Sequence, residues 1–81
     1  MGIRRFVKVD PEKNLRRWYA IAWGQTLFGA WAVVRTWGRL EGNWSQCRIE
    51  EFVTEDEAAA EAKTQVERRQ KRGYAPSEDG R

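Results

Sequence analysis

One stretch of the chain, residues 54–72, carries the clearest α-helix signals in the sequence. Thr54 and Glu57 form the T-x-x-E pattern of a capping box, in which each side chain accepts a hydrogen bond from the other residue's backbone N–H. Acidic residues fill the first turn and basic residues the last, which suits the helix dipole. Gly73 is the residue expected just beyond a helix end. The remaining apolar residues must be buried by other elements, and their pattern indicates strands.

The residues before this helix alternate between two faces at the spacing of β-strands. Tyr19 and Ile21 share one face, for example, and Trp18 lies on the other. Turn-forming residues separate four such runs, which cover residues 3–9, 17–25, 30–39 and 46–53. Short connections favour antiparallel pairing of consecutive strands. The predicted fold is therefore α+β, an antiparallel meander of about four strands with one C-terminal helix packed on one face.

The predicted core combines a narrow helix with bulky sheet residues. The helix presents a stripe of small side chains at helical spacing, namely Ala58, Ala59, Ala62 and Val66. Five tryptophans are available to face it, and a buried aromatic side chain removes roughly 150–250 Å² from water. Three or four of them are therefore expected in the core. Cys47, in the last strand-like run, is expected to be a small buried apolar residue.

The length of 81 residues predicts a single domain. Residues 1–74 contain all the predicted elements, and residues 75–81 are expected to form a flexible C-terminal tail. One cysteine allows no intramolecular disulfide. No apolar run is long enough to cross a bilayer, and no signal peptide is recognisable. We therefore expect a soluble, cytoplasmic protein with no membrane partner.

The composition argues against an enzyme. The chain has no histidine, which removes the usual general base and the histidine-dependent nucleophile systems. Glu50 and Glu51 are adjacent, so on a strand they point to opposite faces and cannot share a site. Neither a phosphate-binding glycine loop nor a metal-ligand cluster is present in the sequence. We expect a non-catalytic protein without a metal or cofactor.

The basic residues are unevenly distributed. Residues 1–53 contain nine Lys and Arg against five Asp and Glu, a charge of +4 in a chain whose total is +3. This part of the chain also contains the stretch Trp37-Gly38-Arg39, in which Trp37 and Arg39 leave a strand on the same face. Gly38 lets the backbone bend, or lets another backbone come close. An indole beside a guanidinium can grip a flat, anionic ligand by stacking and by paired hydrogen bonds.

Two interpretations of Trp37 are open at this point. Tryptophan contributes mostly through burial, so the indole could instead belong to the core, with a solvated arginine beside it. The same choice applies to the other arginines, each of which could be a solvated surface charge.

The motifs together identify a family. Val34-Arg35-Thr36-Trp37-Gly38-Arg39 resembles the signature of the WGR domain. The segment from Val9 to Asn14, the pair Trp18-Tyr19 and the closing Arg72-Gly73-Tyr74 are similar to that family in the same order. The family occurs beside a catalytic domain in eukaryotic poly(ADP-ribose) polymerases and in small bacterial proteins, and this chain resembles the second kind.

The resemblance implies a sheet with one helix against it, and binding to DNA ends at strand breaks. It implies that Trp37 stacks against the sugar of a terminal nucleotide. Arg39 would contact DNA or, as in the polymerases, help hold neighbouring domains.

The first functional hypothesis is therefore a nucleic-acid-binding module that recognises DNA ends or nicks. Arg39 and Arg35 would bind phosphates beside Trp37 and Gly38, while diffuse attraction would come from Arg4, Arg5, Arg16 and Arg17. The alternative hypothesis is a protein-interaction or self-association module that uses the same face, because Trp and Arg often anchor such interfaces.

Overall fold

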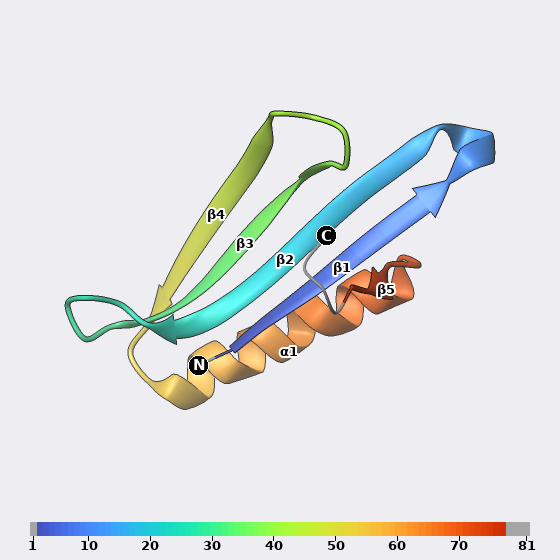
Figure 1. Cartoon of the computed structure of the whole chain (residues 1–81). Coiled ribbons are helices and arrows are strands. Elements are labelled where there is room, and N and C mark those ends of the chain that lie inside the picture. The colour runs from blue at the N-terminus through green and yellow to red at the C-terminus, as the bar shows by residue number, and fades with distance from the viewer. Residues whose placement is uncertain (1, 78–81) are drawn as a thin grey trace.

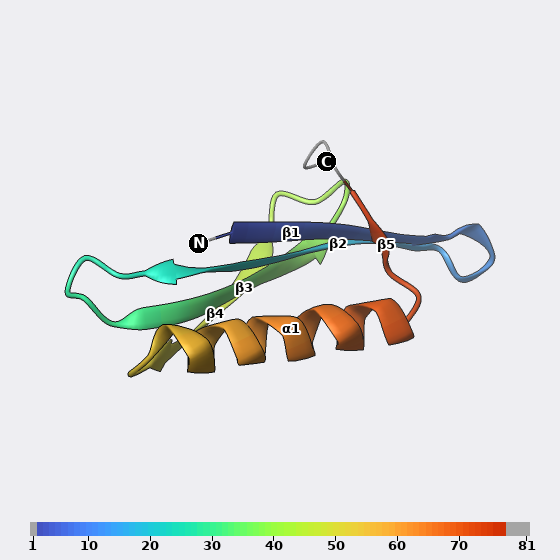
Figure 2. The ribbon, with the colours of Figure 1, turned by 90° about the horizontal axis from the view of Figure 1, so that it is seen from below.

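The computed structural model describes residues 2–77. The elements are, in chain order, β1 (Gly2–Asp10), a 3-10 turn (Pro11–Lys13), β2 (Leu15–Gln25), β3 (Trp31–Arg39), β4 (Ser45–Phe52), α1 (Glu55–Lys71) and β5 (Ala75–Pro76). The strands form one antiparallel sheet in the order β4-β3-β2-β1-β5 (Figure 1). The helix lies against one face of this sheet (Figure 2). The predicted α+β fold and the meander of its first four strands are confirmed.

The short strand β5 is an addition to the predicted sheet. Ala75 and Pro76 pair with Val7 and Phe6 of β1, and the backbone N–H of Ser77 donates to the carbonyl oxygen of Arg5 at 2.8 Å. Ala75 and Pro76 were expected in a flexible tail, but in the structure they pair with β1. These residues reach β1 because the helix end directs the chain back to the sheet. Residues 78–81 of that tail lie outside the described part of the chain.

The helix forms as its termini predict. The Thr54 hydroxyl accepts the Glu57 N–H, and the Glu57 carboxylate accepts the Thr54 N–H, both at 3.2 Å. At the other end Gly73 has a φ of +90°, which glycine adopts without strain. The Tyr74 N–H then donates to the Arg69 carbonyl oxygen at 3.0 Å. This turn brings Tyr74 back against the core.

The core is smaller and less tryptophan-rich than the composition predicts. Its fully buried residues come from β1, β2, β3 and α1, and are Phe6, Tyr19, Ile21, Val33, Ala58 and Ala62. None of the five tryptophans is fully buried, although Trp23, Trp31 and Trp37 pack against this core. The expectation of three or four buried indoles is wrong. The helix packs mainly on β2 and β3. The indole rings of Trp23, Trp31 and Trp37 lie toward the ends of these strands, so each keeps an exposed edge.

The two faces of the sheet have different roles. The face toward α1 carries the buried side chains, and the opposite face has no helix over it in the described part of the chain (Figure 2). Cys47 is exposed, so the prediction that it is buried is wrong. It lies on β4 at an alternate position to the helix-facing residues, and no second layer covers it. Within residues 2–77, no helix combines the length and apolar character that spanning a membrane requires.

Candidate nucleic-acid interface

An open groove of about 820 Å³ lies at the C-terminal end of α1. The β1–β2 hairpin extends past the end of the helix (Figure 2), so the helix leaves the far part of the sheet uncovered. Five aromatic residues line the groove, namely Trp18, Tyr19, Trp37, Trp44 and Tyr74. The Trp18 side chain lies on the other face of the sheet from Tyr19 and Trp37. Three of these aromatic residues come from strands β2 and β3, one from the β3–β4 turn and one from the segment after α1.

The charged residues that line this groove all have one sign. Among the described residues, its lining contains nine Lys and Arg and no Asp or Glu: Lys8, Lys13, Arg16, Arg17, Arg35, Arg39, Arg48, Arg69 and Arg72. They come from β1, the β1–β2 turn, β2, β3, β4 and the end of α1. A concave surface that gathers like charges raises the local concentration of anions.

Trp37 forms part of an ordered aromatic stack in the groove. Its ring lies nearly parallel to that of Tyr19, with 5.5 Å between the ring centroids and 9° between the planes. Tyr19 is buried, and Tyr74 contacts it edge-on at 6.0 Å. Trp37 is partly buried and keeps an accessible part in the groove. The indole packs against the core and also lines the groove, so it combines features of the two interpretations.

Arg69 supports this stack from the helix. Its guanidinium carbon lies 4.3 Å from the centroid of the Tyr19 ring, and the residue is only 9% exposed. Its Nε is buried without a hydrogen-bond partner among the described residues. Sequence reasoning missed Arg69 because the helix stripe was traced only through small and apolar residues. The signal was its spacing, since Ala58, Ala62, Gln65 and Arg69 are the buried positions of α1.

Arg35 lines the groove but already has partners. Its guanidinium donates to Gln65 Oε1 at 3.2 Å and to the Tyr19 hydroxyl at 3.5 Å. It also lies 3.7 Å from a carboxylate oxygen of Glu50, and its side chain is 15% exposed. These contacts fix Arg35 between the sheet and the helix. The positive charge of Arg35 contributes to the groove, while these contacts hold its guanidinium in place.

Arg39 and Arg17 are exposed cations close to Trp37 in the strand register. They are direct cross-strand neighbours on β3 and β2, and Tyr19 and Trp37 form the next pair on the same face. Neither arginine forms an ion pair with a carboxylate of residues 2–77. Two like charges placed side by side repel each other, and an anionic ligand relieves this repulsion.

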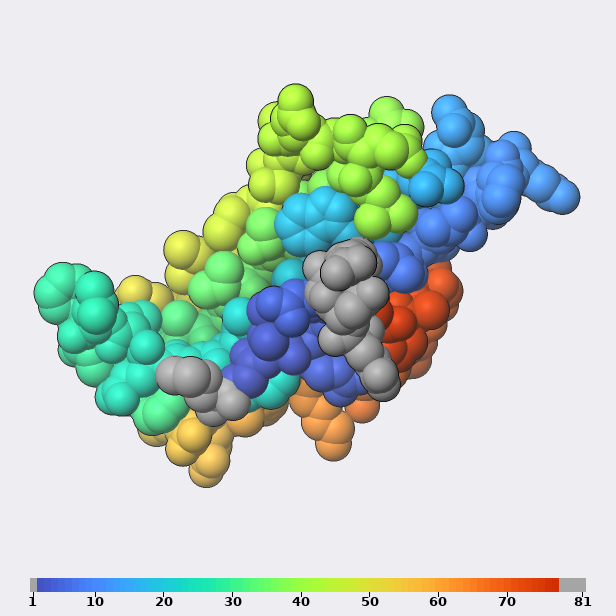
Figure 3. Space-filling model, viewed as in Figure 1, coloured from blue at the N-terminus to red at the C-terminus, as the bar shows by residue number. Residues whose placement is uncertain are grey.

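Gly38 permits a close approach of backbone, one of the two roles predicted for it. A Cβ at this position would lie 2.7 Å from the carbonyl oxygen of Trp44 and 3.1 Å from Nε1 of Trp18. The β3–β4 turn, yellow-green in Figure 3, therefore packs directly against β2 and β3. Gly38 thus places Trp44 at the groove.

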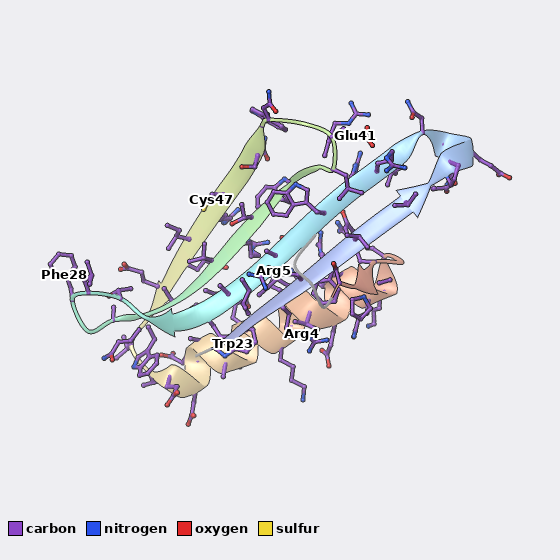
Figure 4. The ribbon with its side chains drawn as sticks, in the orientation of Figure 1. Arg4, Arg5, Trp23, Phe28, Glu41 and Cys47 are labelled. Carbon is purple, nitrogen blue, oxygen red and sulfur yellow. The ribbon has the colours of Figure 1, made fainter. Side chains whose placement is uncertain are left out.

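The other predicted binding arginines are dispersed. Arg16 lines the edge of the groove and forms an ion pair with Glu41. Arg4 lies on the α1 side at a second hollow shared with Trp23, away from the groove. Arg5 is on the opposite face of β1 (Figure 4). The structure brings together Trp37, Gly38, Arg39, Arg35, Arg17 and Arg16, but not Arg4 and Arg5.

Five basic residues of the groove escaped the sequence reasoning, namely Lys8, Lys13, Arg48, Arg69 and Arg72. Lys8 donates from Nζ to the carbonyl oxygen of Arg72 at 2.5 Å and lies over the Tyr74 ring. Arg48 faces Arg35 across β3 and β4. These residues are far apart in sequence from Trp37, so only strand pairing and the helix end bring them to the groove.

The fold and this groove define a small α+β binding domain, and the sequence comparison identifies its family. The profile of the WGR domain family matches residues 3–81. The chain therefore belongs to the WGR domain family. WGR domains are generally nucleic-acid-binding modules.

One curated protein resembles the chain over most of its length. The chain is 33% identical over 69 residues to "Uncharacterized protein y4dW" of Sinorhizobium fredii (strain NBRC 101917 / NGR234). The alignment covers 85% of this chain and 33% of that protein, so the chain spans about a third of the length of the curated relative it matches. No solved structure matches the chain.

Proposed function

We propose that this domain binds DNA at strand ends or nicks, with the groove beside the end of α1 as the binding surface. The observation that carries the proposal is the lining of the groove, which contains nine cations, five aromatic residues and no carboxylate among the described residues. Cations that track a phosphate backbone and rings on which bases or sugars stack are the two components of nucleic-acid binding surfaces.

The side chains divide into contact and support roles in this proposal. Trp37 is the stacking platform, and the exposed Arg17 and Arg39 bind the phosphates beside it. Arg35 supports the lining of the groove, because its guanidinium already contacts Gln65, Tyr19 and Glu50. A platform that is ordered before binding loses less conformational entropy when the ligand arrives.

The partial burial of Trp37 favours a strand end over continuous duplex. Inside a duplex, neighbouring base pairs already cover the faces of each base. An indole recessed in a groove therefore stacks only on a nucleotide that has lost one neighbour. Such nucleotides occur at ends and nicks.

The charge of the groove disfavours the alternative of self-association through the same face. A symmetric dimer places the same patch of both copies in contact. The exposed cations of one copy, Arg17 and Arg39 among them, would then face those of the other, and like charges in contact across an interface cost several kcal/mol. The alternative therefore requires an acidic partner.

A titration against DNA of different topology tests the proposal. We expect the protein to bind nicked and blunt-ended linear DNA more tightly than covalently closed circular DNA of the same sequence, at low and at moderate salt. Equal affinity for the three forms would refute end or nick recognition. Absence of binding to all three at low salt would refute DNA binding altogether.

The salt dependence tests which arginines contact phosphate. Each phosphate contact contributes about 0.9 to the slope of log K against log salt concentration for duplex DNA. Arg39→Ala should lower the magnitude of this slope by roughly 1. The matched control is Arg5→Ala, because Arg5 is equally exposed but lies on the other face of the sheet. Equal slope changes in both variants would assign the binding to diffuse charge instead of the groove.

A further inference from the structure

One indole of the groove lining, apart from Trp18 and Trp37, has no evident structural task. Trp44, in the turn between β3 and β4, is 63% exposed and lies in the lining together with Trp37. It belongs neither to the buried core nor to the partly buried residues that pack against that core. Exposing most of a tryptophan side chain gives up the burial that normally stabilises it.

The position of Trp44 relative to Trp37 is set by the backbone. The Trp44 carbonyl oxygen lies where a Cβ of Gly38 would clash with it, at 2.7 Å. Gly38 directly follows Trp37 in β3, and Ser45 pairs with Gly38. The turn that carries Trp44 is therefore packed onto the residue next to Trp37. This contact lies on the face of β3 opposite the Trp37 side chain, because Gly38 alternates with Trp37 along the strand. Both Trp37 and Trp44 line the groove.

We infer that Trp44 is a second stacking platform and that the ligand of the groove is a DNA end with unpaired nucleotides, a single-stranded overhang. This inference rests on the proposed function and specifies its ligand. One unpaired nucleotide stacks on Trp37 and a neighbouring one on Trp44, while the cations along the groove bind the phosphates between and beside them.

The stacking of DNA itself argues for an unpaired ligand. A blunt duplex end exposes one base-pair face, and every base behind it is covered on both sides. Two separate indoles both find a free base face only where nucleotides are unpaired and can be spread apart. The groove volume of about 820 Å³ is toward the upper end of the roughly 300–1,000 Å³ typical of small-ligand sites. Room therefore remains beside a single nucleotide.

The charge around Trp44 argues against an apolar partner. The groove that it lines holds nine cations and no carboxylate among residues 2–77, and an apolar protein surface docking there would have to desolvate several of them. Unpaired arginines and lysines that lose water at an interface are costly. A stretch of nucleotides supplies both the rings for the indoles and the counter-charges for the cations.

The test uses hairpin-capped duplexes that have a single open end and an internal fluorophore, with fluorescence anisotropy as the readout. The open end is blunt or carries a three-nucleotide overhang of either polarity. The wild-type protein should bind one of the overhang substrates about 5- to 150-fold more tightly than the blunt one, the range for stacking one base on an aromatic ring. Trp44→Ala should lose this preference and bind both substrates as the wild type binds the blunt end.

The matched control is Phe28→Ala, because Phe28 is 96% exposed at the tip of the β2–β3 loop, outside the groove (Figure 4). This variant should keep the overhang preference, and circular dichroism should show both variants folded. A wild-type protein that binds blunt and overhang ends equally would overturn the inference and leave the proposed function intact. If Trp44→Ala keeps the overhang preference, the inference about Trp44 is likewise overturned and the proposed function stands. Failure of the wild type to bind any of these ends would overturn both.

Discussion

Replacing Trp37 by alanine separates the two tasks that this indole performs, because the chain provides a matched control on the same strand. Trp31 also lies on β3, shares the helix-facing side with Trp37 and packs partly buried against the same core. Only Trp37 lines the groove. Trp31→Ala therefore reproduces the loss of packing without the loss of the platform.

The expected loss of stability follows from the packing of the ring. Truncating a fully buried Trp costs about 3–5 kcal/mol, and a partly buried one is expected to cost about 2 kcal/mol. The stack with Tyr19, at 5.5 Å and 9°, adds roughly 0.5–1 kcal/mol. The free energy of unfolding should thus fall by about 2–3 kcal/mol in Trp37→Ala, and by a similar amount in Trp31→Ala. A domain of this length is typically stable by roughly 4–12 kcal/mol, so both variants should remain folded.

Urea unfolding and a DNA-end binding titration check the two effects separately. Both variants should show a lowered unfolding midpoint with an unchanged slope. Only Trp37→Ala should lose affinity for DNA ends, by about 1–3 kcal/mol. If Trp31→Ala loses as much affinity, the loss reports destabilisation and the platform argument is refuted. Wild-type affinity in Trp37→Ala would refute it as well.

Two further predictions concern the elements that position the site. Gly38→Ala places a Cβ 2.7 Å from the Trp44 carbonyl oxygen and should lower the free energy of unfolding in urea by about 1–3 kcal/mol. Gly42→Ala, in the turn between β3 and β4, has its nearest neighbour at 3.5 Å and should cost clearly less. Equal effects would contradict the close-approach argument. Thr54→Ala removes the hydroxyl that accepts the Glu57 N–H and should lower the free energy of unfolding by about 1 kcal/mol. The salt dependence of DNA binding should not change. An unchanged free energy of unfolding would show that the capping box does not stabilise α1.

Features that depend on neighbouring residues were predictable. The capping box and Gly73 mark the helix ends within a few residues, because capping involves hydrogen bonds between residues three to five positions apart. The alternation around Tyr19 and Ile21 places those residues on one face, because a strand turns its side chains over at every residue. The role of Gly38 was predictable only as a choice between bending and close approach.

The amino-acid sequence alone therefore determined the α+β architecture, the order of its main elements and the shared face of Trp37 and Arg39, since each of these rests on local geometry. The tertiary structure alone decided which surfaces are covered. It left Cys47 exposed, kept every indole short of full burial, and buried Arg69 over the Tyr19 ring. It also gathered the cations of five elements and one turn into a single groove, because strand register and the end of a narrow helix bring together residues that are distant in the chain.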